Sequence, residues 1–524
     1  MKMQPESTPA TPGTAPLHDV VRDVPLAMSA AEFRQAGHEL VDMIAQFLES
    51  VPELPVARSS SPDSVRALLR AGERLPETGS ETADLLRSAA DVLFDHSLFN
   101  GHPRFFGYIT SSPAPIGMLG DLLAAAVNAN VGAWRLAPVA TEIEAQAVRW
   151  IAELIGYPQD GGGLFVSGGN MANMVGLFAA RAAAAGWDVR AQGVAAADAR
   201  PLRVYASVET HTWLQKATDL AGIGTDAVRW IPTGDDLRMD TEALRAALAR
   251  DVDAGDLPMM VVGTAGSVST GAVDPLPEIA AICREAGVWF HVDGAYGALA
   301  AAVPGTPEDL EGLRLADSVA VDPHKWLYAP LEAGCVLVRD ATTLRNAFAY
   351  HPPYYHFGEE ATNYSEYGPQ NSRGFRALKV WLALRRAGRE GYVRMIGDDI
   401  RLSERLWALV QAHPELEPCT QGLSITTFRF VPSDLQSEAA DAAGRAATET
   451  YLNELNEALL ERIQGSGAVF VSHAIVRGRY VLRPCIVNFN TRQTDIDALP
   501  DIVTRLGREV DAELRSPLPA GRSA

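Results

Sequence analysis

From about residue 115 to residue 340, segments with a helical pattern of apolar residues alternate with short apolar runs. The helix-like segments are 143–156, 170–186, 240–250 and 275–286, and the apolar runs are LFV at 164–166, RVYAS at 203–207, MMVVGT at 259–264, VWFHVD at 288–293 and CVLVRD at 335–340. Helices and strands that alternate in this way form a mostly parallel sheet covered by helices. The sequence therefore predicts an α/β fold that binds ligands at the carboxyl ends of its strands.

The chain divides by its sequence pattern into five parts. Residues 1–27 are rich in Pro, Thr and Ser, which predicts a disordered tail. Residues 28–114 contain helical segments and no strand pattern, so we expect a helical arm that packs against something else. Residues 115–398 form the predicted large domain, 399–512 a smaller α+β domain and 513–524 a second tail.

The helical arm is expected to begin at Ser29. Ser29 and Glu32 have the spacing of a capping box, in which each side chain bonds to the backbone N–H of the other residue. Apolar residues then recur at helical spacing on one face, namely Phe33, Leu40, Val41, Ile44, Phe47 and Leu48.

Composition and charge exclude several classes of protein. The 524 residues carry a net charge of −20 and contain no Lys/Arg-rich block, which argues against a nucleic-acid binder. The four cysteines form no CxxC pair, so no metal site or disulfide framework is expected, and unpaired thiols favour the cytoplasm. The N-terminus lacks the apolar core of a secretory signal, and there is no apolar run of about 20 residues, so no membrane span is expected.

Lys325 follows the apolar run 318–321 in DSVAVDPHKWLYAP. At the end of a buried strand the side chain is partly desolvated, which favours the neutral amine and makes it available as a nucleophile. The alternative is a lysine that extends from a strand end to solvent.

Asp293 ends the apolar run in WFHVDGAYG and is followed by the small residues Gly294 and Ala295. A carboxylate in this position suits a protonated heteroaromatic nitrogen, because the small residues let a flat ring approach. The alternative is a helix N-cap, a common position for aspartate.

Two further segments place polar groups after strands. FVSGGNMANMVGL, residues 165–177, has a glycine turn, Gly168 and Gly169, before a helix whose first N–H groups can bind phosphate together with Ser167 and Asn170. THTW places His211 after the next run, where a structural histidine is the alternative. A phosphate site, an imidazole, a carboxylate and an amine at strand ends together indicate pyridoxal 5′-phosphate (PLP).

These motifs resemble the group II PLP-dependent amino-acid decarboxylases, a family with aromatic amino-acid, tyrosine, histidine, glutamate and cysteine-sulfinate enzymes. The lysine signature of that family starts at Ser318, includes Lys325 and ends at Arg339 with every spacing met. HVDGAYG and PHKW add to the match, and the similarity runs from about residue 30 to about residue 512. The resemblance implies a fold-type I PLP enzyme and a homodimer with interlocked N-terminal arms and an active site at the subunit interface.

The resemblance also implies roles around the cofactor ring. Lys325 resembles the lysine that forms the Schiff base, and Asp293 resembles the partner of the pyridine nitrogen. Ala295 would pack against one face of the ring and His211 would stack on the other.

Further residues match positions at the edge of the cofactor. Gly168, Gly169 and Asn170 resemble the phosphate-binding turn. Thr264 in VVGTAGS matches a threonine near the cofactor hydroxyl, and His324 would lie under the lysine.

A catalytic tyrosine is implied by the segment 359–381. In the family a mobile loop ahead of an RFRxLK-like segment carries a tyrosine that protonates the decarboxylated carbon, and Tyr364 has that spacing from FRALK. The alternative is that Tyr354, Tyr355, Tyr364 and Tyr367 belong to a merely aromatic loop.

The substrate pocket is expected in the segments 102–115 and 128–144, the second contributed by the partner subunit. The candidate substrate residues are Tyr108, Ile109, Asn130, Gly132, Ser372 and Arg483. Arg483 resembles the arginine that anchors the α-carboxylate in the glutamate branch, although a structural salt bridge is an alternative.

These residues indicate the class of substrate only in part. Animal aromatic decarboxylases have aromatic side chains where this chain has Asn100, Ile109 and Gly132, whereas Ser372 occupies a position that is serine in plant tyrosine enzymes. We expect a small-molecule amino acid with an aromatic, phenolic side chain, such as tyrosine, DOPA, phenylalanine or tryptophan. The alternatives are an acidic amino acid (glutamate, aspartate or cysteine sulfinate) and another fold-type I reaction, by an aldehyde synthase or an aminotransferase.

Asp322 departs from the family pattern. Some relatives have asparagine there, in contact with the cofactor phosphate. An aspartate so close to a dianion would repel it unless the side chain is protonated or turned away.

Overall fold

The computed structural model describes residues 22–58, 60–351, 361–436 and 442–516 and divides into two compact units. The smaller unit consists of residues up to 50 and 60–97, and the larger one of 51–59 and the chain from Leu98 onward. The segments 51–58 and 98–114, predicted to lie in the helical arm, thus belong to the larger unit.

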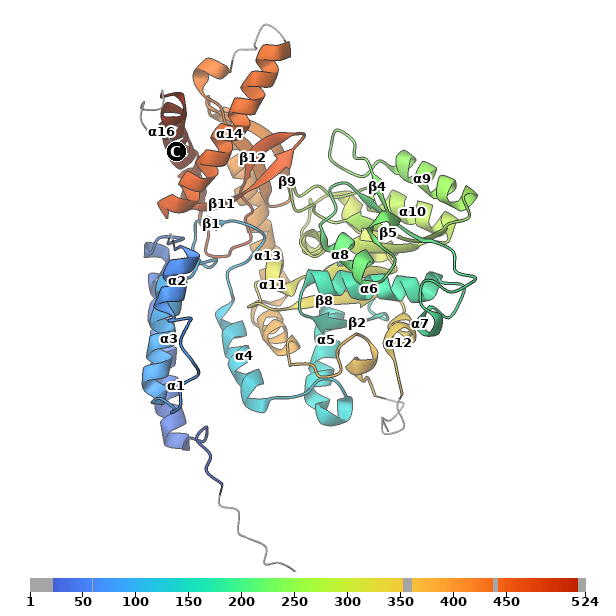
Figure 1. The fold of residues 1–524 in the computed structure, drawn as a ribbon, viewed down its shortest axis with the longest axis horizontal. Coiled ribbons are helices and arrows are strands. Elements are labelled where there is room, and N and C mark those ends of the chain that lie inside the picture. Colours follow the sequence, from blue (N-terminus) through green and yellow to red (C-terminus); the bar gives the residue numbers. More distant parts are fainter. Residues whose placement is uncertain (1–21, 59, 352–360, 437–441, 517–524) are drawn as a thin grey trace, which may run out of the picture. The chain divides into compact units, whose positions relative to one another are not determined.

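The smaller unit contains helices α1 (Ala30–Ser50), α2 (Pro62–Leu68) and α3 (Thr82–His96) (Figure 1). The predicted capping box is confirmed, because Ser29 N donates to Glu32 Oε2 at 2.7 Å and Glu32 N donates to Ser29 Oγ at 3.2 Å. The rings of Phe47 and Phe94 stack at 4.1 Å, but α1 has no buried residue. Among the described residues of this unit only Ala90 on α3 is buried.

The larger unit is built on a seven-stranded sheet in the order β2-β8-β7-β6-β5-β3-β4 (Figure 1). Its strands are β2 (Gly162–Val166), β3 (Leu202–Ser207), β4 (Val228–Ile231), β5 (Leu257–Thr264), β6 (Trp289–Asp293), β7 (Ser318–Val321) and β8 (Gly334–Val338). The predicted mostly parallel sheet is confirmed, and β8 alone among these strands runs antiparallel to its neighbours. Strand β4 was not predicted, because Arg229 interrupts its short apolar run.

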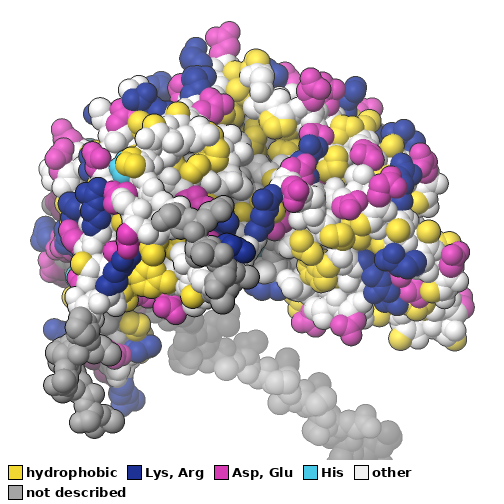
Figure 2. All heavy atoms as spheres, turned by 90° about the horizontal axis from the view of Figure 1, so that it is seen from above, with side chains coloured by type: hydrophobic (Ala, Val, Ile, Leu, Met, Phe, Trp, Pro, Cys, Tyr) yellow, Lys and Arg dark blue, Asp and Glu magenta, His cyan; other side chains and the backbone are white. Residues whose placement is uncertain are grey.

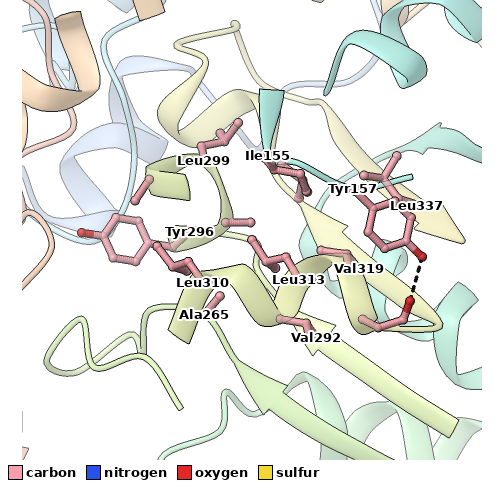
Figure 3. Packing of buried hydrophobic residues seen from close by; sticks show 14 of the residues in the cluster. Ile155, Tyr157, Ala265, Val292, Tyr296, Leu299, Leu310, Leu313, Val319 and Leu337 are labelled. Carbon is pink, nitrogen blue, oxygen red and sulfur yellow. Dashed lines mark hydrogen bonds between the residues drawn. The ribbon is translucent and has the colours of Figure 1, made fainter. Parts of the chain in front are cut away.

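Alternate residues of each strand bury opposite faces of this sheet. Phe165, Tyr205, Val261 and Phe290 pack with α5 (Pro138–Leu154), α9 (Thr241–Asp253) and α10 (Leu276–Ala286). The residues between them pack against α6 (Gly169–Ala184) and α8 (Trp213–Leu220) on the other face. Figure 3 shows part of the first layer, where the Tyr157 hydroxyl donates to Ala316 O at 3.1 Å.

A five-stranded sheet forms the centre of the C-terminal part, in the order β1-β11-β12-β10-β9. Its strands are β1 (Phe105–Phe106), β9 (Leu416–Gly422), β10 (Ile425–Phe430), β11 (Phe470–Val476) and β12 (Arg479–Arg483). Helices α14 (Ala442–Ser466) and α16 (Leu499–Arg515) contribute to its core. The predicted domain boundary at 398 falls inside α13 (Ala377–Ala412), which is interrupted at Gly388 by a left-handed φ of 65°.

The remaining elements are short or connect the two sheets. They are α4 (Pro115–Val127), α7 (Val189–Gln192), α11 (Pro323–Trp326), α12 (Thr342–Phe348), α15 (Gln493–Asp497) and the 3-10 helices Val51–Glu53, Trp134–Leu136, Thr225–Ala227, Gly297–Ala302, Glu308–Leu315, Tyr364–Glu366 and Ser433–Leu435.

The described surface carries charges of both signs. On the face shown in Figure 2, acidic and basic side chains are interspersed among apolar patches, and neither sign fills a large area. Within the described ranges, no helix combines the length and apolarity needed to cross a membrane. The same residues contain no group of three or more His, Cys, Asp and Glu placed to hold a metal ion.

Candidate active site

A cavity of about 280 Å³ opens at the carboxyl ends of the strands, where α/β sheets bind ligands. Residues that follow β2, β3, β5, β6 and β7 line it, together with residues from the C-terminal part. Of the predicted site residues, the cavity brings together Tyr108, Ile109, Gly169, Asn170, His211, Thr264, Asp293, Ala295, Lys325 and Arg483. Residues far apart in the sequence therefore share one cavity because the strand ends meet at one edge of the sheet.

Lys325 provides the amine of this cavity. The chain has only four lysines, and Lys379 is buried in an ion pair with Asp121 while Lys216 lies exposed on α8. Lys325 lies on the single turn α11 directly after β7, and its Nζ is 3.1 Å from Asp322 Oδ2. The short helix fixes the lysine at the strand end, so the amine faces the cavity instead of extending to solvent.

Trp326 stabilises the same turn. Its indole Nε1 donates to Asp399 Oδ2 at 2.8 Å, and its ring stacks on Tyr296 with centroids 4.9 Å apart. Tyr296 also lines the cavity and bonds to Ser424 through its hydroxyl at 2.7 Å. Trp326 thus positions the turn through packing and one buried hydrogen bond.

Asp293 is the carboxylate at the end of β6. Trp213 Nε1 donates to its Oδ2 at 2.7 Å, and Ala295 N donates to its Oδ1 at 3.2 Å. These donors stabilise negative charge on a side chain that is otherwise buried. Asp293 does not cap a helix, since the next helical segment begins at Gly297.

His211 lies at the mouth of the cavity. Trp213 N donates to its Nδ1 at 3.2 Å, which places the proton of the neutral ring on Nε2. Much of the ring is accessible, but the packing around its base desolvates the imidazole and lowers the pKa of His211. The neutral ring is suited to stack on a flat ligand.

The glycine turn begins α6 at the edge of the cavity. A Cβ on Gly169 would lie 2.6 Å from Asp322 Oδ2 and 3.0 Å from Ala295 Cβ, so only glycine fits there. The first N–H groups of a helix have no partner within the helix and favour an anion. The preceding residue, Gly168, lies close to His324, since a Cβ on Gly168 would be 3.3 Å from His324 Cε1.

Two buried oxygen atoms of this cavity have no hydrogen-bond partner among the described residues, Thr264 Oγ1 and Asp322 Oδ1. Buried polar atoms are rarely left unpaired unless a ligand or water satisfies them. The cavity is therefore suited to a ligand with several polar groups.

Arg483 ends β12 and brings a buried positive charge to the cavity. Its side chain is 4% exposed, and its NH1 donates to Tyr108 O at 3.1 Å. No carboxylate lies within 4 Å of it in the described part of the chain, and burial lowers the pKa of Arg483. A buried cation without a counter-charge suits a ligand carboxylate.

Sequence reasoning missed Asn173, which lines the cavity one turn after Asn170 on α6. Its Oδ1 lies 2.7 Å from His291 Nε2, and His291 Nδ1 lies 2.7 Å from Ser318 Oγ. The spacing of three residues between the two asparagines places both on one helix face and could have indicated this position.

Three predicted substrate residues lie outside the cavity that a single chain forms. Asn130 Oδ1 accepts from Gly132 N and from Arg373 N, both at 3.1 Å, so Asn130, Gly132 and the backbone after Ser372 form one cluster. None of the three lines the cavity.

Tyr364 also lies outside the cavity. Its side chain is 3% exposed in a hydrophobic cluster with Leu164, and the Arg373 guanidinium lies 4.8 Å from its ring centroid. Burial raises the pKa of Tyr364 well above the usual range of a phenol. Of the other tyrosines of the aromatic loop, Tyr367 packs against Tyr364 with ring centroids 5.8 Å apart, and Tyr354 and Tyr355 fall outside the described residues.

The family described as "Pyridoxal-dependent decarboxylase conserved domain" matches residues 62–431. The chain belongs to the pyridoxal-dependent decarboxylases. An aromatic-L-amino-acid decarboxylase of Bacillus atrophaeus is 32% identical over 93% of this chain and 97% of its own length. A phenylacetaldehyde synthase of a Rosa hybrid cultivar is 29% identical over 90% of this chain and 94% of its own length. The crystal structure of Oryza sativa TDC with PLP and tryptamine covers 93% of this chain and 99% of its own with a TM-score of 0.84 and 29% identity.

This decarboxylase is a carboxy-lyase of the fold-type I class, and its cofactor is PLP. The residues that line the cavity are themselves suited to bind PLP. It offers an amine at Lys325, a carboxylate at Asp293, a helix start at Gly169 and an unpaired hydroxyl at Thr264. These are the partners that an aldehyde, a ring nitrogen, a phosphate and a ring hydroxyl require.

Proposed function

We propose that this enzyme removes the α-carboxyl group of an aromatic L-amino acid, releasing CO2 and an amine. The observation that carries the proposal is the Lys325 amine in one cavity with the Asp293 carboxylate and the buried Arg483 cation. A bound amino acid presents a carboxylate that can pair with this cation and an amino group that must reach the cofactor.

Each residue has a separate task in the proposed reaction. PLP, when bound, supplies an electron sink for the charge left by departing CO2. Lys325 Nζ would hold the cofactor covalently. Asp293, with its two hydrogen-bond donors, would stabilise a proton on the ring nitrogen, and the start of α6 would bind the phosphate.

Proton delivery is assigned to residues that line the cavity. His211 presents Nε2–H to the cavity, and the Lys325 amine lines the same cavity as a second group that can carry a proton. The role of Tyr364 stays a prediction from the family resemblance, and the mechanism proposed here gives it no step because its ring is buried elsewhere.

Substrate class is argued from the lining of the cavity. Among the described lining residues, the basic side chains are His211, Lys325 and Arg483. If Lys325 serves the cofactor and Arg483 the α-carboxylate, no cation is left for an acidic side chain. Ile109, Tyr296 and Val268 offer apolar contact instead, and relatives named for aromatic amino acids support the same class.

A panel of the twenty amino acids with DOPA and cysteine sulfinate tests this proposal. We expect CO2 and the matching amine from tyrosine, DOPA, phenylalanine or tryptophan, at kcat/KM at least about tenfold above any acidic substrate. Preference for glutamate, aspartate or cysteine sulfinate would overturn the substrate class. An aldehyde or a keto acid as the main product would instead indicate an aldehyde synthase or an aminotransferase.

We further propose a homodimer with the active site at the subunit interface. Leu119, Leu122, Leu123 and Val127 on α4 are each more than half exposed, an apolar face that a second copy would cover. The segment after α4 carries Asn130 and Gly132, which are not among the described residues that line the Lys325 cavity of their own chain. The four cysteines are free thiols, which supports the expected cytoplasmic location.

Subunit complementation tests the shared site. Lys325→Ala and Asn130→Ala chains are expected to be weakly active alone, whereas co-expression should restore about a quarter of wild-type activity, because half of the dimers are mixed and each has one intact site. Activity in the mixture no higher than the mean of the two single variants would show that Asn130 serves its own chain.

A further inference from the structure

Asp322 is the one carboxylate in contact with the Lys325 amine among the residues that the structure describes. Its Oδ2 lies 3.1 Å from Lys325 Nζ and 3.7 Å from His324 Nε2. The residue is 2% exposed, and its Oδ1 has no hydrogen-bond partner within the described ranges. A buried carboxylate that is only half satisfied costs stability, so its position calls for a function.

Helix capping does not explain Asp322. The residue precedes α11, where an aspartate commonly caps a helix, but its side chain makes no cap hydrogen bond. It lines the cavity instead. Since a Cβ on Gly169 would lie 2.6 Å from Asp322 Oδ2, the carboxylate lies against the first residue of α6.

The start of α6 attracts anions, because the N–H groups of its first turn have no partner within the helix and the helix dipole is positive there. Asp322 therefore lies in the region that a phosphate at this helix start would use. Two negative groups at one helix start repel each other strongly where water is largely excluded.

We propose that Asp322 competes with the phosphate of PLP for the start of α6 and, through its ion pair with Lys325, lowers the affinity of this enzyme for its cofactor. The inference rests on the proposed function, which takes this helix start as the phosphate site. Cofactor binding then requires the carboxylate to leave Gly169 and to release Lys325 Nζ. The loaded fraction of the enzyme follows the supply of PLP more closely than it would with a neutral residue at this position.

The test compares the wild type with Asp322→Asn, which keeps the size of the side chain and removes its charge. The dissociation constants of PLP and of pyridoxal, which lacks the phosphate, are measured on cofactor-free protein by equilibrium dialysis. We expect the variant to bind PLP at least about tenfold more tightly and pyridoxal less than about threefold more tightly. Inorganic phosphate alone should also bind the cofactor-free variant more tightly than the cofactor-free wild type.

Asp340→Asn is the matched control for the loss of one negative charge. Asp340 bonds to Thr342 N and Oγ1 and does not line the cavity, so its variant should bind PLP as the wild type does. Asp322→Ser serves as a second uncharged variant and should also bind PLP more tightly. Folding of each protein is checked by its thermal transition.

Three outcomes would overturn the inference. The first is PLP binding that is unchanged or weaker in both Asp322 variants, which would show that Asp322 does not compete with the phosphate. The second is an affinity for pyridoxal that rises as much as the affinity for PLP, which would show that the phosphate is not involved. In both cases the proposed function still stands if the wild type binds PLP and loses this binding after Lys325→Ala. Wild-type protein that binds no PLP, or binds it equally well after Lys325→Ala, overturns the proposed function together with this inference.

Discussion

Lys325→Ala should abolish covalent retention of PLP and lower the decarboxylation rate by at least about a thousandfold. The physical reason is that no other described lysine can replace it. Lys379 is buried and held in an ion pair with Asp121, and Lys216 lies on the exposed side of α8. Borohydride reduction of the loaded wild type, followed by peptide mass analysis, should place the cofactor on Lys325.

Lys325→Arg is the control for folding in this experiment. Alanine would leave Asp322 as a buried carboxylate without its partner, which alone can destabilise the protein. Arginine keeps the positive charge beside Asp322 but is not a nucleophile at neutral pH. We expect this variant to keep the thermal transition of the wild type and to form no reduced adduct; an adduct on another lysine would contradict the assignment.

Asp293→Asn should lower kcat by about a hundredfold to a thousandfold while PLP stays attached to Lys325. Asparagine has nearly the same shape and can still accept from Trp213 Nε1 or Ala295 N. It lacks the negative charge that stabilises a proton on the ring nitrogen, so the loss falls on the chemical step.

The adduct on Lys325 provides the control for Asp293→Asn, because it reports cofactor binding independently of turnover. An intact adduct with a reduced kcat supports the electrostatic role. Wild-type kcat in this variant would falsify it, and loss of the adduct would mean that Asp293 mainly holds the cofactor in place.

Much of the sheet could be predicted because its strands have a strong local pattern. The runs at 203–207, 259–264 and 288–293 are apolar on both sides, as buried parallel strands require, and each appears as a strand. The direction of β8 could not be predicted, because an apolar run is the same in both directions and only pairing with β2 and β7 orients it.

The candidate site was predictable to the extent that its groups follow strands. Asp293 ends a strand, Gly169, His211 and Lys325 follow strand ends within a few residues, and parallel strands bring such residues to one edge. Asn173 was missed because it lies inside α6 and not directly at a strand end, and only its spacing of three residues from Asn170 indicates that it shares the cavity face.

Spacing along the chain does not decide where Tyr364 lies. The interval from Tyr364 to FRALK matches the family pattern, but the folded chain buries this ring beside Arg373, which also bonds to Glu144. Burial of an aromatic ring in an apolar cluster depends on neighbours from distant segments, and the sequence around Tyr364 contains none of them.

The sequence by itself determined the fold class, the cofactor and the residues that carry the chemistry, because strand ends and the motifs around Lys325 and Asp293 are local features. Only the tertiary structure decided what Asp322 contacts. Its negative charge is paired with Lys325, three residues later, and its carboxylate lies next to Gly169, which is 153 positions earlier in the chain. Electrostatic balance in a buried cavity depends on distances between groups, and those distances exist only after the strands have come together.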